Sequence, residues 1–318
     1  MALSQPNLTR RAFLGLTAAL PLAGCSADTT TTPAPAGSPP GEPAGAASPA
    51  PVSPFVDSSD ELAELERKFD ARLGVYALAV GTGKEIAHRA DERFAFCSTF
   101  KGLAAAAVLS RNPMAYLDTV VTYSADDLMK SSFITKDHVA TGMTIRQLCD
   151  AAVRYSDGTA GNLLLREIGG PAGFTAYTRG LGDTVTRMDR TEPALAEANP
   201  DDPRDTTSPR AIGTDYRKIV LGDALPTDRR AFLRDLLERN TTGAQRIRAA
   251  VPKGWTVADK TGTGNFGAVN DIAVVWPPAA DPFVIAVMSN KTTRDAEYNQ
   301  ALVAEAAAHV ITVFTAPA

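Results

Sequence analysis

Strand-like segments lie at both ends of the folded part of this chain, and helical patterns fill the sequence between them. Apolar runs bounded by turn residues predict four strands, at residues 72–80, 256–260, 270–276 and 282–290. Distant strands share one sheet only if the residues between them fold beside it. We therefore predict an α+β fold: an antiparallel sheet built from both chain ends and flanked by helices, packed against a mostly helical domain.

Helical periodicity dominates the middle of the sequence. Apolar residues recur at helical spacing in six segments, at residues 101–109, 144–155, 159–168, 172–181, 209–221 and 228–239. Two further helices are predicted at 60–69, with Asp60 as the cap, and at 295–314. The folded region, 55–318, thus divides into an α/β part at about 55–93 and 240–318 and a helical part at about 94–239.

The first 54 residues show no pattern of a folded core. Residues 1–24 combine paired arginines, a short apolar run and small residues before Cys25, which predicts an export signal of the twin-arginine type with a lipoprotein box. An ordinary signal with a chance cysteine is the alternative. Residues 25–54 contain eight prolines among small residues and are predicted to be a disordered tether. We expect export and a lipid anchor on Cys25 at the outer face of the cytoplasmic membrane, with some protein released.

The composition excludes several classes of function. The formal net charge is −4 and the charged residues are interspersed, so no nucleic-acid partner is expected. The three histidines, His88, His138 and His309, lie far from one another and from any cysteine pair, which argues against a metal site. We expect a monomer.

A serine and a lysine open one of the predicted helices. Ser98 and Lys101 are three residues apart, which places both side chains on one helical face, so the lysine can reach the serine oxygen. Free backbone N–H groups at the start of that helix can stabilise a developing oxyanion. The alternative is a capping serine beside a lysine whose charged end reaches solvent.

Two further motifs add hydroxyl and amino groups. Ser156 begins a Ser-Asp-Gly sequence between two predicted helices, where a simple turn is the alternative. Lys260 begins a Lys-Thr-Gly sequence at the end of an alternating strand, and Gly262 there lets a substrate approach the strand backbone. The charge of Lys260 and the hydroxyls of Thr261 and Thr263 suit a substrate carboxylate.

The order and spacing of these motifs resemble those of the class A serine β-lactamases. The resemblance covers about residues 58–315 and includes the segment from Arg190 to Asp205, which is similar to the omega loop of that family. By resemblance, Arg190 and Asp205 form the ion pair that closes this loop, and Glu192 lies within it. The resemblance implies hydrolysis of β-lactam antibiotics, as small-molecule substrates, through a serine acyl-enzyme and without a cofactor.

Each motif takes a role by this resemblance. Ser98 is the nucleophile, Lys101 removes its proton with help from Glu192 through a water, and Ser156 passes a proton to the leaving ring nitrogen. Glu192 then directs water at the ester. The backbone N–H groups of Ser98 and Thr263 form the oxyanion hole. The residues implied in substrate binding are Gly158, Arg246, Lys260, Thr261, Gly262 and Thr263.

Three positions depart from the family pattern, and all three lose side-chain bulk. Gly158 replaces an asparagine that hydrogen-bonds the acylamino group of the substrate, and Ala196 replaces an asparagine that helps to hold the hydrolytic water. Ser131 replaces an aromatic residue at the entrance to the active-site groove. We predict a roomier, less preorganised groove that retains turnover but positions water differently.

Two cysteines remain if Cys25 carries the lipid. Some relatives bridge the position of Cys97 to that of Gly264, and others bridge the position of Cys149 to that of Ala105, so neither partner exists here. We therefore predict two free, buried thiols.

Two other functions fit part of the sequence. A penicillin-binding transpeptidase or carboxypeptidase shares the serine, lysine and Lys-Thr-Gly motifs but lacks the omega-loop glutamate, so Glu192 argues against it. A non-catalytic substrate-binding lipoprotein fits the anchor and the tether, but it gives no reason for Ser98, Lys101 and Lys260 to occur together. For Arg246, a basic residue on the surface is the alternative to a role in binding.

Overall fold

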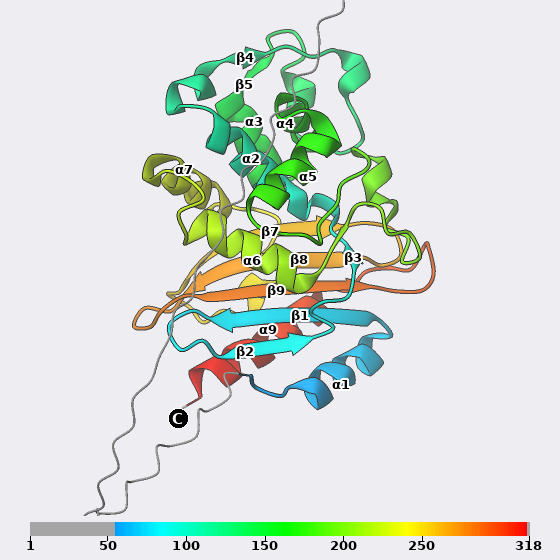
Figure 1. Ribbon diagram of the computed structural model, residues 1–318. Coiled ribbons are helices and arrows are strands. Elements are labelled where there is room, and N and C mark those ends of the chain that lie inside the picture. Colours follow the sequence, from blue (N-terminus) through cyan, green and yellow to red (C-terminus); the bar gives the residue numbers. More distant parts are fainter. Residues whose placement is uncertain (1–54, 317–318) are drawn as a thin grey trace, which may run out of the picture. The chain divides into compact units, whose positions relative to one another are not determined.

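The computed structural model describes residues 55–316, and its main sheet joins the two ends of that region (Figure 1). Five antiparallel strands lie in the order β2-β1-β9-β8-β7, so the N-terminal hairpin meets the C-terminal strands where β1 pairs with β9. The strands are β1 (Arg72–Ala79), β2 (Glu85–His88), β7 (Thr256–Thr263), β8 (Val269–Trp276) and β9 (Phe283–Asn290). The predicted α+β fold, with a sheet from both chain ends, is confirmed.

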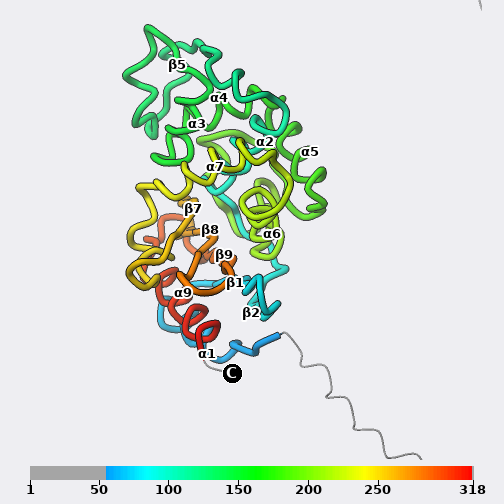
Figure 2. The backbone as a smooth tube through the Cα atoms, turned by 90° about the vertical axis from the view of Figure 1, so that its left-hand side faces the viewer, coloured from blue at the N-terminus to red at the C-terminus, as the bar shows by residue number. Residues whose placement is uncertain are grey.

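Each face of the sheet buries its own apolar cluster. On one face, Val75 and Ile285 belong to a cluster that includes residues of α1 (Ser59–Phe69) and α9 (Gln300–Thr315). On the other face, Ile272 and its neighbours pack with α6 (Pro209–Val220) and the other helices of residues 100–238. Figures 1 and 2 show α1 and α9 on the side of the sheet opposite α6.

The helix α2 (Phe100–Arg111) forms the centre of the helical part. Every residue from Phe100 to Leu109 is buried, as expected for a helix that is apolar on all sides. It contacts five helices, which are α3 (Ile145–Arg154), α4 (Gly158–Glu167), α5 (Gly170–Gly180), α6 and α7 (Thr227–Glu238). The first turn of α2 is therefore held rigidly on all sides.

Shorter elements complete the chain. Two small antiparallel pairs join β3 (Phe94–Ala95) to β6 (Thr206–Thr207) and β4 (Val120–Val121) to β5 (Met143–Thr144). The short helix α8 spans Ile247–Ala250. Five 3-10 turns lie at η1 (Cys97–Thr99), η2 (Met114–Asp118), η3 (Ala125–Asp127), η4 (Thr135–Asp137) and η5 (Ala194–Glu197).

Two predicted helix starts are wrong. The first helix begins at Ser59 and places Asp60 inside the first turn, so Asp60 is not the cap. The last helix begins at Gln300 rather than near 295, because the side chain of Asn299 accepts a hydrogen bond from the N–H of Ala301 (2.9 Å) and caps the helix there. The residues before it form a loop instead, in which the carbonyl of Arg294 accepts a hydrogen bond from Phe266 (2.7 Å).

The predicted export signal, the tether and Cys25 lie outside the described residues. Among residues 55–316, none of the helices combines the length and the apolar character that crossing a bilayer requires. Cys97 and Cys149 are free and buried, as predicted. Burial raises the pKa of each of these thiols to about 12, so neither is a ready nucleophile.

Candidate active site

Ser98 lies in the η1 turn directly before α2. The preceding residue, Cys97, has φ 47°, a left-handed conformation that is uncommon for residues other than glycine. Lys101, in the first turn of α2, places its Nζ 3.0 Å from Ser98 Oγ. The lysine is completely buried, and a Cβ on Gly161 of α4 would lie 2.8 Å from its Cε, so α4 closes over the lysine stem. The spacing in sequence thus brings the amine to the hydroxyl.

Glu192 completes a tight group of three. Its Oε1 accepts a hydrogen bond from Ser98 Oγ (2.8 Å) and forms an ion pair with Lys101 Nζ (2.8 Å). The sequence predicted a water between Glu192 and Ser98, but in the structure the contact is direct. Glu192 is only 8% exposed, and the hydroxyl of Ser98 therefore touches two groups able to move its proton.

Asn162 holds the backbone of Glu192, a contact that the sequence did not reveal. The Asn162 Nδ2 donates to the carbonyl of Glu192 (2.8 Å), and its Oδ1 accepts from the N–H of Glu192 (3.1 Å). Asn162 lies inside α4, where asparagine has a poor helix propensity. That poor propensity was the only local signal of its role.

An ion pair fastens the two ends of the omega loop. Arg190 Nε lies 2.6 Å from Asp205 Oδ2. The other oxygen of Asp205 accepts hydrogen bonds from the backbone N–H groups of Asp189 (2.8 Å) and Arg190 (2.9 Å). Asp205 is fully buried, so its charge is compensated by three donors and the loop carrying Glu192 is closed at its base.

Ser156 connects the two lysines. Its backbone has φ 58°, and in this conformation its carbonyl accepts from Lys101 Nζ (2.7 Å) while its Oγ accepts from Lys260 Nζ (3.1 Å). Lys260 is completely buried. Burial, reinforced by the positive charge of Lys101, lowers the pKa of Lys260 to about 7.

A buried hydrogen-bond network that the sequence did not predict holds Asp259, the residue before Lys260. Its neighbour Asp259 is fully buried, and its carboxylate accepts from Arg248 Nε (2.6 Å) and from Asn240 Nδ2 (2.7 Å). These partners come from the segment that links α7 to β7. They fix the strand position from which Lys260 reaches Ser156.

Strand β7 packs directly on the turn that carries Ser98. A Cβ on Gly262 would lie 2.7 Å from the carbonyl oxygen of Phe96, which leaves room for no residue but glycine. The sequence predicted that Gly262 admits a substrate, but the group in close contact is the η1 turn itself. Strand β7 and the η1 turn are therefore in direct contact at Gly262. Next to it, Thr261 Oγ1 lies 2.5 Å from Thr242 Oγ1.

Arg246 is part of the site interior rather than of the surface. It is 5% exposed, so the alternative of a surface residue is wrong. Its guanidinium donates to Thr263 Oγ1 (2.7 Å), to the carbonyls of Gly262 (2.9 Å) and Asn270 (2.7 Å), and to Gln300 Oε1 (3.0 Å). Four of its five donors are used, and its main contact with the site is the hydroxyl of Thr263.

The prediction of a roomier site is wrong at Gly158. A Cβ on Gly158 would lie 2.3 Å from Ser131 Oγ, 2.5 Å from Glu192 Oε2 and 2.6 Å from Met129 Sδ. The N–H of Gly158 also donates to the carbonyl of Ser131 (3.0 Å). The side chains of Ser131, Met129 and Glu192 fill the space that a side chain at position 158 would need. Ala196 is the third position that departs from the family pattern. Its backbone carbonyl accepts a hydrogen bond from the N–H of Asn265 (3.0 Å).

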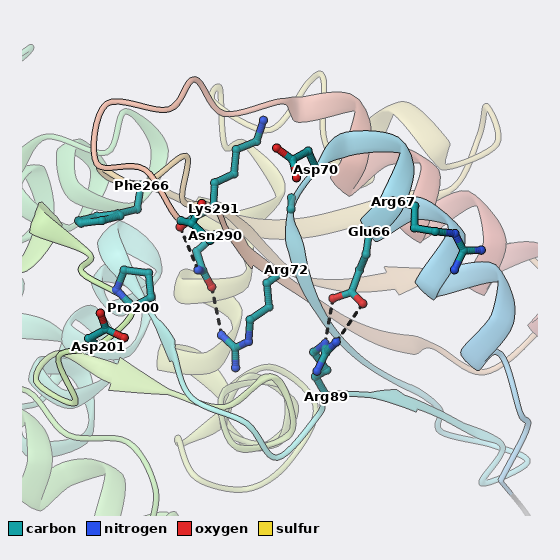
Figure 3. Close-up of a pocket in the computed structure, with 12 residues that line it drawn as sticks. Glu66, Arg67, Asp70, Arg72, Arg89, Pro200, Asp201, Phe266, Asn290 and Lys291 are labelled. Atoms are coloured by element: carbon teal, nitrogen blue, oxygen red, sulfur yellow. Dashed lines mark hydrogen bonds and ion pairs between the residues drawn. The ribbon is translucent and has the colours of Figure 1, made fainter.

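A separate cavity of about 540 Å³ opens between the omega loop and the ends of β1 and β9 (Figure 3). Its guanidinium groups are already paired: Arg89 Nε lies 2.8 Å from Glu66 Oε1, and Arg72 Nη1 lies 3.0 Å from Asn290 Oδ1. None of the predicted site residues lines it. Among residues 55–316, no cluster of three or more His, Cys, Asp or Glu side chains is arranged to hold a metal ion.

Known proteins are similar to this chain in both sequence and fold. The family described as the β-lactamase enzyme family matches residues 57–314. A β-lactamase of Mycobacterium tuberculosis is 58% identical over 258 residues, which cover 79% of this chain and 84% of that protein. A β-lactamase of Amycolatopsis lactamdurans is 55% identical over 264 residues, which cover 83% and 87%.

Solved structures agree with the sequence relatives. The class A β-lactamase from Mycobacterium abscessus superposes with a TM-score of 0.78 at 47% identity, covering 81% of this chain and 99% of that one. The class A β-lactamase from Clostridium kluyveri gives a TM-score of 0.80 at 46% identity, covering 81% and 98%. The residues that the family model matches include the segment from Arg190 to Asp205. This chain therefore belongs to the β-lactamase enzyme family and, within it, to the class A serine enzymes.

Proposed function

We propose that this protein hydrolyses β-lactams through an ester on Ser98. The observation that carries the proposal is the convergence of Lys101 and Glu192 on one hydroxyl. When Ser98 Oγ attacks the β-lactam carbonyl, its proton passes to the Lys101–Glu192 pair, whose Nζ and Oε1 are 2.8 Å apart. A C–O bond forms, and the carbonyl oxygen gains negative charge.

The surrounding groups stabilise the next steps. The close packing of β7 on the η1 turn supports an oxyanion hole made by the N–H groups of Ser98 and Thr263. As the ring C–N bond breaks, Ser156 Oγ gives its proton to the nitrogen and receives in its place the proton that the Lys101–Glu192 pair took from Ser98, so that Glu192 is again an ionised base. The adjacent Lys260 stabilises the Ser156 oxygen during this transfer. Lys260, Thr261 and Thr263, the last oriented by Arg246, bind the substrate carboxylate.

Glu192 then releases the product. Its carboxylate takes a proton from water, the resulting hydroxide attacks the ester carbonyl, and the C–O bond to Ser98 breaks as the proton returns to Ser98 Oγ. The direct 2.8 Å contact between Ser98 and Glu192 provides the route for that return. The fixed omega-loop glutamate favours hydrolysis over the transpeptidase alternative.

Hydrolysis of a chromogenic cephalosporin by the parent, Glu192→Gln and Ser98→Ala tests this function. We expect rapid turnover by the parent, a trapped adduct on Ser98 in Glu192→Gln by mass spectrometry, and neither in Ser98→Ala. A long-lived adduct on the parent itself would move the protein to the penicillin-binding class. Absence of any adduct would leave a non-catalytic binding protein.

We also propose that the chain is exported and anchored by lipid on Cys25. The support is the sequence of residues 1–25 alone. Incorporation of labelled fatty acid into the full chain, and its loss in Cys25→Ala with unchanged hydrolysis, is the expected result. If the parent protein takes up no label, residues 1–25 are an ordinary export signal without a lipid anchor.

A further inference from the structure

The space beside Gly158 is filled by a hydroxyl from another segment. Ser131 Oγ lies 2.3 Å from the point where a Cβ of residue 158 would stand, and Glu192 Oε2 lies 2.5 Å from the same point. The two oxygens are therefore at most about 4.8 Å apart, the sum of those distances. Glu192 Oε2 is the oxygen that neither Ser98 nor Lys101 occupies. Ser131 Oγ thus lies near Glu192 Oε2, the carboxylate oxygen that contacts neither Ser98 nor Lys101.

The segment that carries Ser131 is fastened to the start of α4 by several hydrogen bonds. The carbonyl of Ser131 accepts from the N–H of Gly158 (3.0 Å). Asp157 Oδ2 accepts from the N–H groups of Ile134 (2.8 Å) and Thr135 (2.9 Å). Ser132 Oγ lies 2.8 Å from Thr159 Oγ1. The backbone that carries the Ser131 hydroxyl is therefore held in position before any substrate binds.

That hydroxyl is available to a ligand. Within residues 55–316, no protein group forms a hydrogen bond with Ser131 Oγ, although the residue is half-buried. The next residue differs, because Ser132 Oγ accepts from the N–H of Met129 (2.9 Å) and contacts Thr159. Ser131 therefore offers a free donor beside the reacting groups, whereas Ser132 is committed to the protein.

The substrate has a group suited to this donor. In penicillins and cephalosporins the acylamino substituent sits on the carbon next to the reactive carbonyl, so its oxygen lies within a few bonds of the atom that Ser98 attacks. The ring carboxylate is directed towards Lys260 and Thr261, which leaves the acylamino group on the side of Gly158 and Ser131. We propose that the Ser131 hydroxyl donates a hydrogen bond to the acylamino carbonyl and makes Ser131 a specificity-determining residue. This inference rests on the proposed function.

Two substrates separate this role from a structural one. Benzylpenicillin carries the acylamino carbonyl, whereas 6-aminopenicillanic acid has a bare amine at the same carbon. For Ser131→Ala we expect kcat/KM for benzylpenicillin to fall roughly 3- to 10-fold, the range for one uncharged hydrogen bond. For 6-aminopenicillanic acid the value should stay within about 2-fold of the parent.

Ser132→Ala is the matched control, because it removes a hydroxyl from the same segment that is bonded within the protein. It should lower Tm and reduce kcat/KM for both substrates by the same factor. Equal losses on both substrates in Ser131→Ala, or no loss on either, would overturn the inference while leaving the proposed function intact. Failure of benzylpenicillin to label Ser98 in the parent would instead overturn the proposed function, and the inference with it.

Discussion

The hydroxyl of Tyr216 donates a hydrogen bond of 2.7 Å to the backbone carbonyl of Thr99, the residue that follows Ser98. Tyr216 lies on α6 and is completely buried, so this bond ties the layer between sheet and helices to the first turn of α2. Gly102 makes room for it, since a Cβ there would lie 2.2 Å from Tyr216 Oη. The buried Tyr216 side chain therefore fixes the position of the turn that carries Ser98.

Gly102→Ala should displace that phenol. We expect a loss of about 1–3 kcal/mol in the free energy of unfolding from overpacking, together with slower acylation of Ser98. Tyr216→Phe alone should cost about 1 kcal/mol, because one buried hydrogen bond is lost. In the double variant part of the Gly102→Ala penalty should disappear, since the clashing oxygen is gone. Strictly additive losses in denaturant unfolding would contradict this coupling.

The lowered pKa of Lys260 predicts an alkaline limit to substrate binding. Below pH 7 the side chain is an ammonium that attracts the substrate carboxylate, and above pH 7 it becomes neutral. The value of kcat/KM, which reports the free enzyme, should therefore fall by about 3- to 10-fold per pH unit above pH 7. Lys260→Arg keeps its charge and should remove this limb from the profile. An identical limb in both proteins would assign it to another group.

Asn162→Ala should affect turnover more than substrate binding. Two hydrogen bonds to the backbone of Glu192 are lost, so the carboxylate no longer sits at a fixed distance from Ser98. We expect kcat to fall on the order of 10- to 100-fold with KM little changed, and the adduct on Ser98 to accumulate. Asn112→Ala is the control, because Asn112 bonds a backbone carbonyl at the far end of α2 (2.8 Å). Similar kinetics in the two variants would show that only stability had changed.

Asp215 should make stability fall as pH rises. Neither of its buried oxygens has a hydrogen-bond partner among the described residues, and burial, with Asp183 nearby, raises its pKa to about 9. Since the unfolded side chain ionises near pH 4, the folded state binds the extra proton between about pH 4 and 9, and the free energy of unfolding decreases across that window. Above pH 9 both states are ionised.

Asp215→Asn removes the titration and should stabilise the protein at pH 8 by on the order of 4 kcal/mol relative to pH 5. Urea unfolding of parent and variant at the two pH values provides the measurement. The outcome that would contradict the argument is a difference between the two proteins that does not change with pH. Asp223→Asn is the control, because Asp223 does not belong to the pair formed by Asp215 and Asp183.

Local patterns predicted the elements well and the contacts between distant segments poorly. The spacing of Ser98 and Lys101 and the alternation of β7 are local properties, so both could be predicted from the sequence. The fit of Ser131 against Gly158 joins residues 27 positions apart, and no periodicity specifies it. The start of the last helix was misplaced because acidic and polar residues before Asn299 suit a helix N-terminus as well as a loop.

The strand β9, which joins the two ends of the sheet, follows Ser98, Lys101, Ser156, Glu192 and Lys260 in the chain. β1 pairs with it from Arg72 opposite Asn290 to Ala79 opposite Phe283. A nascent chain that stops before residue 283 already holds every catalytic side chain, but its N-terminal hairpin has no edge to join. We therefore expect a chain that ends before residue 283 to lack activity.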